Sequence, residues 1–133
     1  MLASAVMIAD PIVAAAGATS AEVAALMRLR NISVVPVIDN PKDRRYLGTV
    51  SDRDIVVRCV AMGHDPKECS AQDHMRTDTA VVSPATELDG YRLARQLDAA
   101  DHHVRSTIVV VDGNRAVVGF IPHPEEVAGI VIA

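Results

Sequence analysis

Strand-forming runs of valine and isoleucine alternate along this chain with stretches in which apolar residues recur every three or four positions. That alternation is typical of strands connected by amphipathic helices. Val23, Leu26 and Met27 predict one such helix, and the apolar runs at residues 34–38 and 46–50 predict strands joined by a polar turn. The first half of the chain is therefore expected to hold a helix followed by a β-hairpin.

Two further elements complete this unit. A short strand is predicted at Ile12 and Val13, before the helix, and a second helix at residues 52–62, after the hairpin. Thr19 and Glu22 have the spacing of a capping box, which marks the start of the first helix. The predicted order is strand, helix, strand, strand, helix.

The same order recurs in the second half of the chain, where Met75 takes the place of Met7. The second copy is predicted to contain strands at residues 80–82, 108–111 and 116–121, a helix capped by Thr86 and Asp89, and a closing helix that starts near Pro124. Residues 1–66 thus form one repeat and residues 67–133 the other. A unit of this size buries little apolar surface alone, so we expect the two repeats to share a core.

Several polar groups are predicted at the junction between the second hairpin strand and the helix after it. Ser51 is placed at the N-cap of that helix and Asp54 three residues later. A carboxylate there can accept hydrogen bonds from both hydroxyls of a ribose, while free amides and the positive helix end favour phosphate. The same two residues also fit a capping box in which each satisfies the other's backbone donor. Local sequence leaves both interpretations open.

Four blocks of sequence carry a resemblance to a known family, at residues 6–7, 19–27, 32–39 and 48–55. With these blocks the chain resembles a small stand-alone bacterial protein made of a tandem pair of CBS domains, also called a Bateman module. The last block, GTVSDRDI, is similar to the family's ribose motif of a glycine, an apolar pair and Ser/Thr-x-x-Asp. The resemblance implies an α/β (α+β) fold of two βαββα halves, related by pseudo-twofold symmetry and packed through their sheets.

The resemblance also implies a function, that of a regulatory sensor without catalytic activity. Such a module binds an adenine nucleotide (AMP, ADP or ATP) as its ligand, requires no cofactor and signals to an effector protein, unknown here, by changing conformation. Ser51 and Asp54 would hold the ribose. By position, Ile12, Val13, Val34 and Pro36 would line the base pocket, and Arg53, Arg44 and His123 would contact phosphate.

Two alternatives to the nucleotide sensor stay open. One is a dimerisation or scaffold module in which Ser51 and Asp54 only cap a helix, and the other is a binder of a different adenosyl ligand such as S-adenosylmethionine. The helices predicted at residues 52–62 and 125–131 look amphipathic, and family members usually pair two modules through such helices. We therefore expect a homodimer.

The second copy departs from the ribose motif. Pro122 falls where Ser51 stands in the first copy, and Glu125 falls where Asp54 stands. Proline offers neither a hydroxyl nor a backbone donor. We therefore expect one nucleotide per chain, bound by the first repeat.

Charge and composition argue against nucleic acid and membranes as binding partners. The 133 residues carry a net charge of −4, and aromatic residues make up 2% of them. A chain with this charge and so few stacking side chains is not expected to bind nucleic acid. The apolar stretch at residues 127–133 is too short to span a bilayer, so no membrane association is expected.

Catalytic and metal-binding patterns are weak. We find no Ser-His-Asp order, nucleophile elbow or Walker loop, so catalysis is not predicted. The two cysteines form no CxxC pattern, and their use fits a reducing, cytoplasmic location. The linker gathers His64, Asp65, Cys69, Asp73 and His74. Their spacing matches no zinc motif, and no metal site is predicted.

Overall fold

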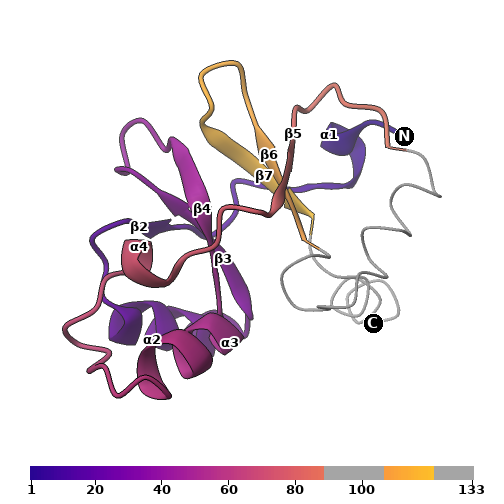
Figure 1. Ribbon diagram of the computed structural model, residues 1–133. Coiled ribbons are helices and arrows are strands. Elements are labelled where there is room, and N and C mark those ends of the chain that lie inside the picture. The colour runs from indigo at the N-terminus through magenta and orange to yellow at the C-terminus, as the bar shows by residue number, and fades with distance from the viewer. Residues whose placement is uncertain (89–106, 122–133) are drawn as a thin grey trace. The chain divides into compact units, whose positions relative to one another are not determined.

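The computed structural model describes residues 1–88 and 107–121, which form two compact units (Figure 1). We call Ile12–Asp78 the middle unit, and Met1–Pro11 with the chain from Thr79 onward the terminal unit. Each unit combines the strands of one predicted repeat with the leading segment of the other. Among the described residues, no helix has the length and apolar character needed to cross a membrane.

The middle unit has the predicted strand, helix, strand, strand, helix order. Its elements are β2 (Ala14–Ala15), α2 (Ser20–Arg30), β3 (Val34–Ile38), β4 (Tyr46–Ser51), α3 (Asp52–Asp54), η1 (Ile55–Val60) and α4 (Ala71–His74). The sheet has the order β2-β3-β4, with β2 parallel and β4 antiparallel to β3. The first strand lies two residues later than predicted, because Ala14 is the residue that pairs with Val37 while the more β-prone Ile12 and Val13 precede the ladder.

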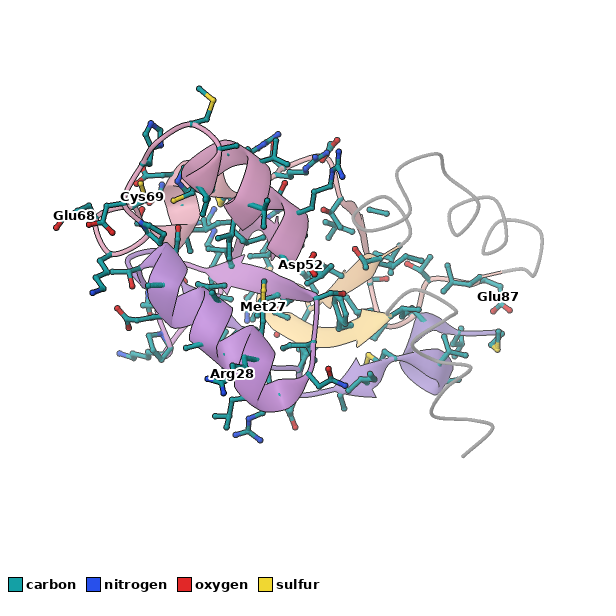
Figure 2. All side chains as sticks on the ribbon, turned by 90° about the horizontal axis from the view of Figure 1, so that it is seen from below. Met27, Arg28, Asp52, Glu68, Cys69 and Glu87 are labelled. Carbon is teal, nitrogen blue, oxygen red and sulfur yellow. The ribbon has the colours of Figure 1, made fainter. Side chains whose placement is uncertain are left out.

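Helix α2 forms as its sequence predicts. The Thr19 hydroxyl accepts a hydrogen bond from the Glu22 amide at 3.1 Å, and the helix ends at Asn31 in the left-handed conformation. Val23 and Met27 are buried, whereas Arg28 points away from the protein (Figure 2). The apolar side of α2 packs into a core that also contains Val35, Val37, Val50 and Ile55.

The helix predicted at residues 52–62 is helical through Val60 but has two parts. A short α3 passes directly into η1, a π-helix in which the Ala61 amide bonds the Val56 carbonyl. The apolar spacing of so short a segment does not distinguish an α-helix from a π-helix, so the sequence predicted only the helix. Turns of π-helix are rare in proteins, and those that occur often lie at functional sites. Gly63 follows with φ +78°, a conformation that suits glycine at a helix end.

The terminal unit contains α1 (Ala3–Val6), β1 (Ile8–Ala9), β5 (Ala80–Val82), β6 (Ile108–Val111) and β7 (Val117–Ile121). Its sheet has the order β1-β7-β6-β5. The three strands predicted for the second copy are confirmed, with β7 starting one residue later than expected. The body of the helix capped by Thr86 and Asp89, Pro122, His123, Glu125 and the closing helix lie outside the described residues.

One glycine in each unit explains why a leading segment packs against the other repeat's strands. A Cβ added to Gly48 would lie 2.5 Å from the Arg76 carbonyl oxygen and 2.9 Å from the Met75 sulfur. A Cβ added to Gly119 would instead meet the side chain of Met7, which would have to move. The close approach of the Met75–Arg76 backbone to β4 therefore requires glycine at position 48, and Gly119 leaves room for the Met7 side chain.

Candidate functional site

Ser51 and Asp54 form a reciprocal capping box at the start of α3. The Ser51 hydroxyl accepts from the Asp54 amide at 3.0 Å, and Asp54 Oδ2 accepts from the Ser51 amide at 2.9 Å. Ser51 is the last residue of β4, so the strand delivers its side chain to the first turn of the helix. The two residues thus cap the helix in this structure. A ligand would have to bind Ser51 and Asp54 while these capping hydrogen bonds are kept.

Asp54 is also paired with arginine. The second carboxylate oxygen, Oδ1, accepts a hydrogen bond from Arg76 Nε at 2.8 Å and lies 3.9 Å from Arg58 Nε. Only 1% of the Asp54 surface is exposed, whereas the Arg58 side chain is 44% exposed. The site is therefore a buried carboxylate flanked by two cationic side chains, one of them open to solvent.

The backbone next to β4 holds Arg76 in place. The Arg76 amide donates to the Thr49 carbonyl at 2.7 Å, and the Thr49 amide donates to the Arg76 carbonyl at 2.9 Å. Gly48 allows this approach because it has no side chain to meet Arg76. Gly48, three positions before Ser51, thus allows Arg76 to lie against Asp54, although Arg76 follows Asp54 by 22 positions in the chain.

The Asp54 carboxylate can still accept further hydrogen bonds in this arrangement. Two carboxylate oxygens provide about four lone-pair sites, and the described contacts of Asp54 occupy one on each oxygen with a bond shorter than 3 Å. A vicinal diol can therefore donate to the remaining sites if Arg76, which covers the carboxylate, turns aside. An anion can meet the guanidinium groups released or exposed by that movement.

The residues predicted for the base pocket lie along the neighbouring strand. Val34 pairs directly with Ser51 in the β3–β4 ladder, and Pro36 pairs with Thr49. Both are buried, while Ile12 and Val13 are half-buried just before β2. The structure thus places Val34 beside Ser51 in the ladder and sets Pro36 two positions further along β3.

The predicted phosphate contacts have different positions. Arg53 is exposed on α3, between Ser51 and Asp54. Arg44 lies in the turn before β4, so a strand of roughly 20 Å separates it from Ser51. The structure therefore does not bring Arg44 to the Ser51 end of the hairpin, and His123 lies outside the described residues.

Arg58 and Arg76 are cations that the sequence analysis did not select. Arg58 follows Asp54 by four residues, a spacing that signals a possible ion pair on a helix. Arg76 has no such local signal, because its contact with Asp54 depends on the backbone pairing with Thr49. Its position follows from the three-dimensional structure alone.

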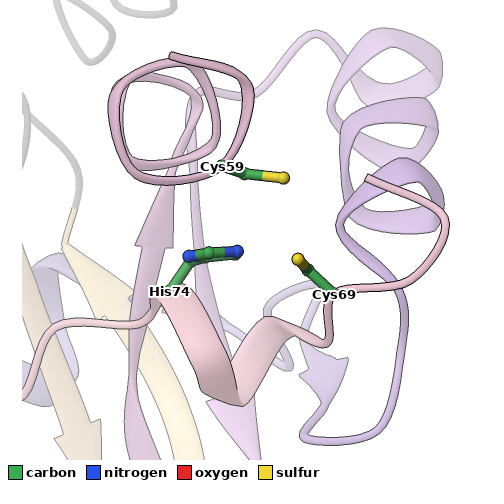
Figure 3. A group of neighbouring side chains, drawn as sticks. All are labelled: Cys59, Cys69 and His74. Carbon is green, nitrogen blue, oxygen red and sulfur yellow. The ribbon is translucent and has the colours of Figure 1, made fainter. Parts of the chain in front are cut away.

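A second polar cluster lies in the same unit, in the linker that follows η1. The side chains of Cys59, Cys69 and His74 point toward one another (Figure 3), and their ligand atoms all lie within 4.8 Å of each other. Partial burial raises the pKa of the Cys69 thiol, and the neighbouring Cys59 and the Asp73 carboxylate raise it further. Hydrogen bonds from Ser70 lower the pKa of Asp73.

Comparison with known proteins identifies the fold. The family model of the CBS domain matches residues 3–60. Hypoxic Response Protein I, in a crystal structure with two coordinated zinc ions, superimposes with a TM-score of 0.76 at 23% identity, over 96% of this chain and 98% of that chain. A search of curated proteins found no match.

Two further solved structures have the same fold. A putative acetoin utilization protein (AcuB) from Vibrio cholerae has a TM-score of 0.79 at 22% identity, over 98% of this chain and 90% of that chain. CBSX2, a CBS-pair protein from Arabidopsis thaliana, has a TM-score of 0.72 in its complex with AMP, at 18% identity over 98% and 96% of the two chains. Residues 3–60 therefore match the CBS domain family, and the chain as a whole has the fold of CBS-pair proteins such as CBSX2.

Proposed function

We propose that this protein is a regulatory module that binds an adenine nucleotide at Ser51 and Asp54. The observation that carries the proposal is the buried Asp54 carboxylate, which caps a helix within a GTVSDRDI block and is flanked by Arg58 and Arg76. CBSX2, which shares the fold, forms a complex with AMP. CBS-domain proteins are generally regulatory and non-catalytic, and we propose no catalytic step here.

Ribose binding in this proposal uses the free lone pairs of Asp54. The 2′ and 3′ hydroxyls donate to Oδ1 and Oδ2 while the Ser51 amide keeps its bond to Oδ2. Arg76 gives up its 2.8 Å contact with Oδ1 and turns toward the phosphate. Arg76 thus exchanges its ion pair with Asp54 for an ion pair with the phosphate, so little electrostatic stabilisation is lost.

The base and phosphate groups extend from the ribose in opposite directions. Val34, on the strand next to Ser51, offers an apolar surface to the adenine, with Pro36, Ile12 and Val13 as further lining candidates. Arg53 and Arg58 join Arg76 as phosphate contacts, because all three lie within four residues of Asp54 or in contact with it. We propose one nucleotide per chain.

The same module is proposed to act as a homodimer. Val56, Val57, Val60 and Met62 are 45–67% exposed on η1 and just after it, which leaves an apolar surface uncovered. A twofold contact between two copies of this surface would bury it. If nucleotides fail to bind, this surface favours the alternative of a dimerisation or scaffold module. Val57→Asp should then convert a dimer to a monomer in light scattering, whereas the solvent-facing Glu22→Gln should leave the dimer unchanged.

The nucleotide signal would reach an effector protein in the cytoplasm. Exchange of Arg76 between Asp54 and phosphate changes the segment around residue 76, which is a conformational change tied to ligand binding. A partner that binds one arrangement better than the other would respond to it. S-adenosylmethionine offers the same ribose and is the adenosyl alternative.

Thermal unfolding with a ligand panel tests the proposal. A ligand held at about 100 times its dissociation constant stabilises the native state by about 2.7 kcal/mol. We expect a rise in Tm with AMP, ADP or ATP that is lost in Asp54→Asn and retained in the capping-box control Glu22→Gln. A rise only with S-adenosylmethionine would change the ligand class. No rise with any of the four compounds would favour the scaffold alternative.

A further inference from the structure

The cluster of Cys59, Cys69 and His74 has the dimensions of a metal site. Cys59 comes from η1, Cys69 from the linker and His74 from the end of α4, and the three side chains meet in the space between these elements (Figure 3). The ligand atoms lie within 4.8 Å of one another. In a tetrahedral zinc site with Zn–S bonds of ~2.3 Å, two sulfur ligands lie ~3.8 Å apart. Small side-chain rotations therefore bring all three atoms to one centre.

A second observation points to a ligand at the same place. His74 is 5% exposed, and its Nε2 atom is buried without a hydrogen-bond partner among the described residues. A buried polar atom left without a partner destabilises a protein. Such an atom calls for an explanation, and a metal ion bound by the lone pair of this nitrogen provides one.

The two thiols of the cluster lie close together without forming a disulfide. Cys59 is fully buried and its thiol donates to the His64 carbonyl over 3.8 Å. The ring of His64 stacks on that of His74 with centroids 5.9 Å apart. Both cysteines are free thiols in this structure. Their sulfur atoms are thus held close together but are not joined in a disulfide.

We propose that Cys59, Cys69 and His74 bind one zinc ion. Thiolate and imidazole are the ligand types that zinc prefers, and two thiolates neutralise the charge of a divalent cation after the two thiol protons have left for solvent. A neutral centre suits a site in which two of the three ligands are buried. Three protein ligands leave the fourth tetrahedral position for water.

The proposed zinc has a structural consequence. It would connect η1 to residues 69–74 and so fix the chain two residues before Arg76. The sequence analysis predicted no metal here, because it considered the linker residues alone and their spacing fits no zinc motif. The missing ligand is Cys59, which comes from the preceding helix.

Metal analysis of the full chain tests the site. Protein purified under reducing conditions is stripped with a chelator, then titrated with Zn²⁺ and, for its visible spectrum, with Co²⁺. We expect roughly one metal ion per chain and a thiolate-to-cobalt charge-transfer band. Removing an outer-shell partner costs ~10–100-fold in metal affinity, so Cys69→Ser, which removes a ligand, should cost at least about 100-fold.

The controls separate metal loss from unfolding. Cys69 is half-buried, so Cys69→Ser should keep the parent's circular dichroism, and Glu68→Gln beside it should keep the parent's metal affinity. His74→Gln should lose affinity as Cys69→Ser does. The proposal is overturned if the parent gives no charge-transfer band, if Cys69→Ser binds as the parent does, or if Cys59 and Cys69 are recovered as a disulfide from reducing conditions.

Discussion

Asp54 and His74 are both buried polar side chains of the middle unit, but their surroundings differ. Asp54 accepts from the Ser51 amide and from Arg76, so each of its oxygens has a partner. His74 Nε2 has none among the described residues. A ligand of Asp54 must therefore displace Arg76, whereas a ligand of His74 adds an interaction without removing one. We expect the metal site to bind its ligand more tightly than the carboxylate site.

Removal of zinc should have the largest effect. A metal present at about 1,000 times its dissociation constant stabilises the native state by about 4.1 kcal/mol. Stripping the parent protein should therefore lower its Tm clearly, and added zinc should restore it. Cys69→Ser should have a low Tm that zinc does not raise. If zinc changed the Tm of the parent and of Cys69→Ser equally, the Cys59, Cys69 and His74 cluster would not be the zinc site, and its contrast with Asp54 would fail.

Two substitutions of Asp54 measure what its satisfied hydrogen bonds contribute. Asp54→Asn keeps an oxygen for the Ser51 amide but removes the charge that Arg76 meets, a loss of about 1.5–3 kcal/mol. Asp54→Ala also removes the acceptor of the Ser51 amide, which adds about 0.5–1.5 kcal/mol. The free energy of unfolding, measured in urea, should fall in the order parent, Asn, Ala. Equal free energies of unfolding for the three proteins would show that the hydrogen bonds of Asp54 do not stabilise the fold.

Gly48→Ala should have a smaller effect through the position of Arg76. The new Cβ would lie 2.5 Å from the Arg76 carbonyl, and overpacking of this kind costs about 1–3 kcal/mol. Gly17 is the matched control, because a Cβ there has no atom within 4 Å. Urea unfolding should show a loss for Gly48→Ala and none for Gly17→Ala. Similar unfolding curves for Gly48→Ala and Gly17→Ala would show that the Arg76 contact does not depend on glycine at position 48.

The two clusters also show what a sequence can predict. The capping boxes of Thr19 and Ser51 depend on residues three positions apart, so their side-chain pattern is visible in the sequence and the structure confirms them. The strands of both hairpins are predicted for the same local reason. Arg76 and Cys59 were missed because their partners are distant in sequence, and tertiary packing brings them together.

Titration calorimetry with AMP tests the central claim, that Asp54 holds the ribose of one nucleotide per chain. Charge-assisted hydrogen bonds contribute about 1.5–3 kcal/mol each, and about 1.4 kcal/mol is a tenfold change in affinity. We therefore expect one site in the parent and an affinity at least about tenfold lower in Asp54→Asn, with Glu22→Gln unchanged. Two sites per chain, or an Asp54→Asn protein that binds like the parent, would contradict the assignment and leave Ser51 and Asp54 as a helix cap.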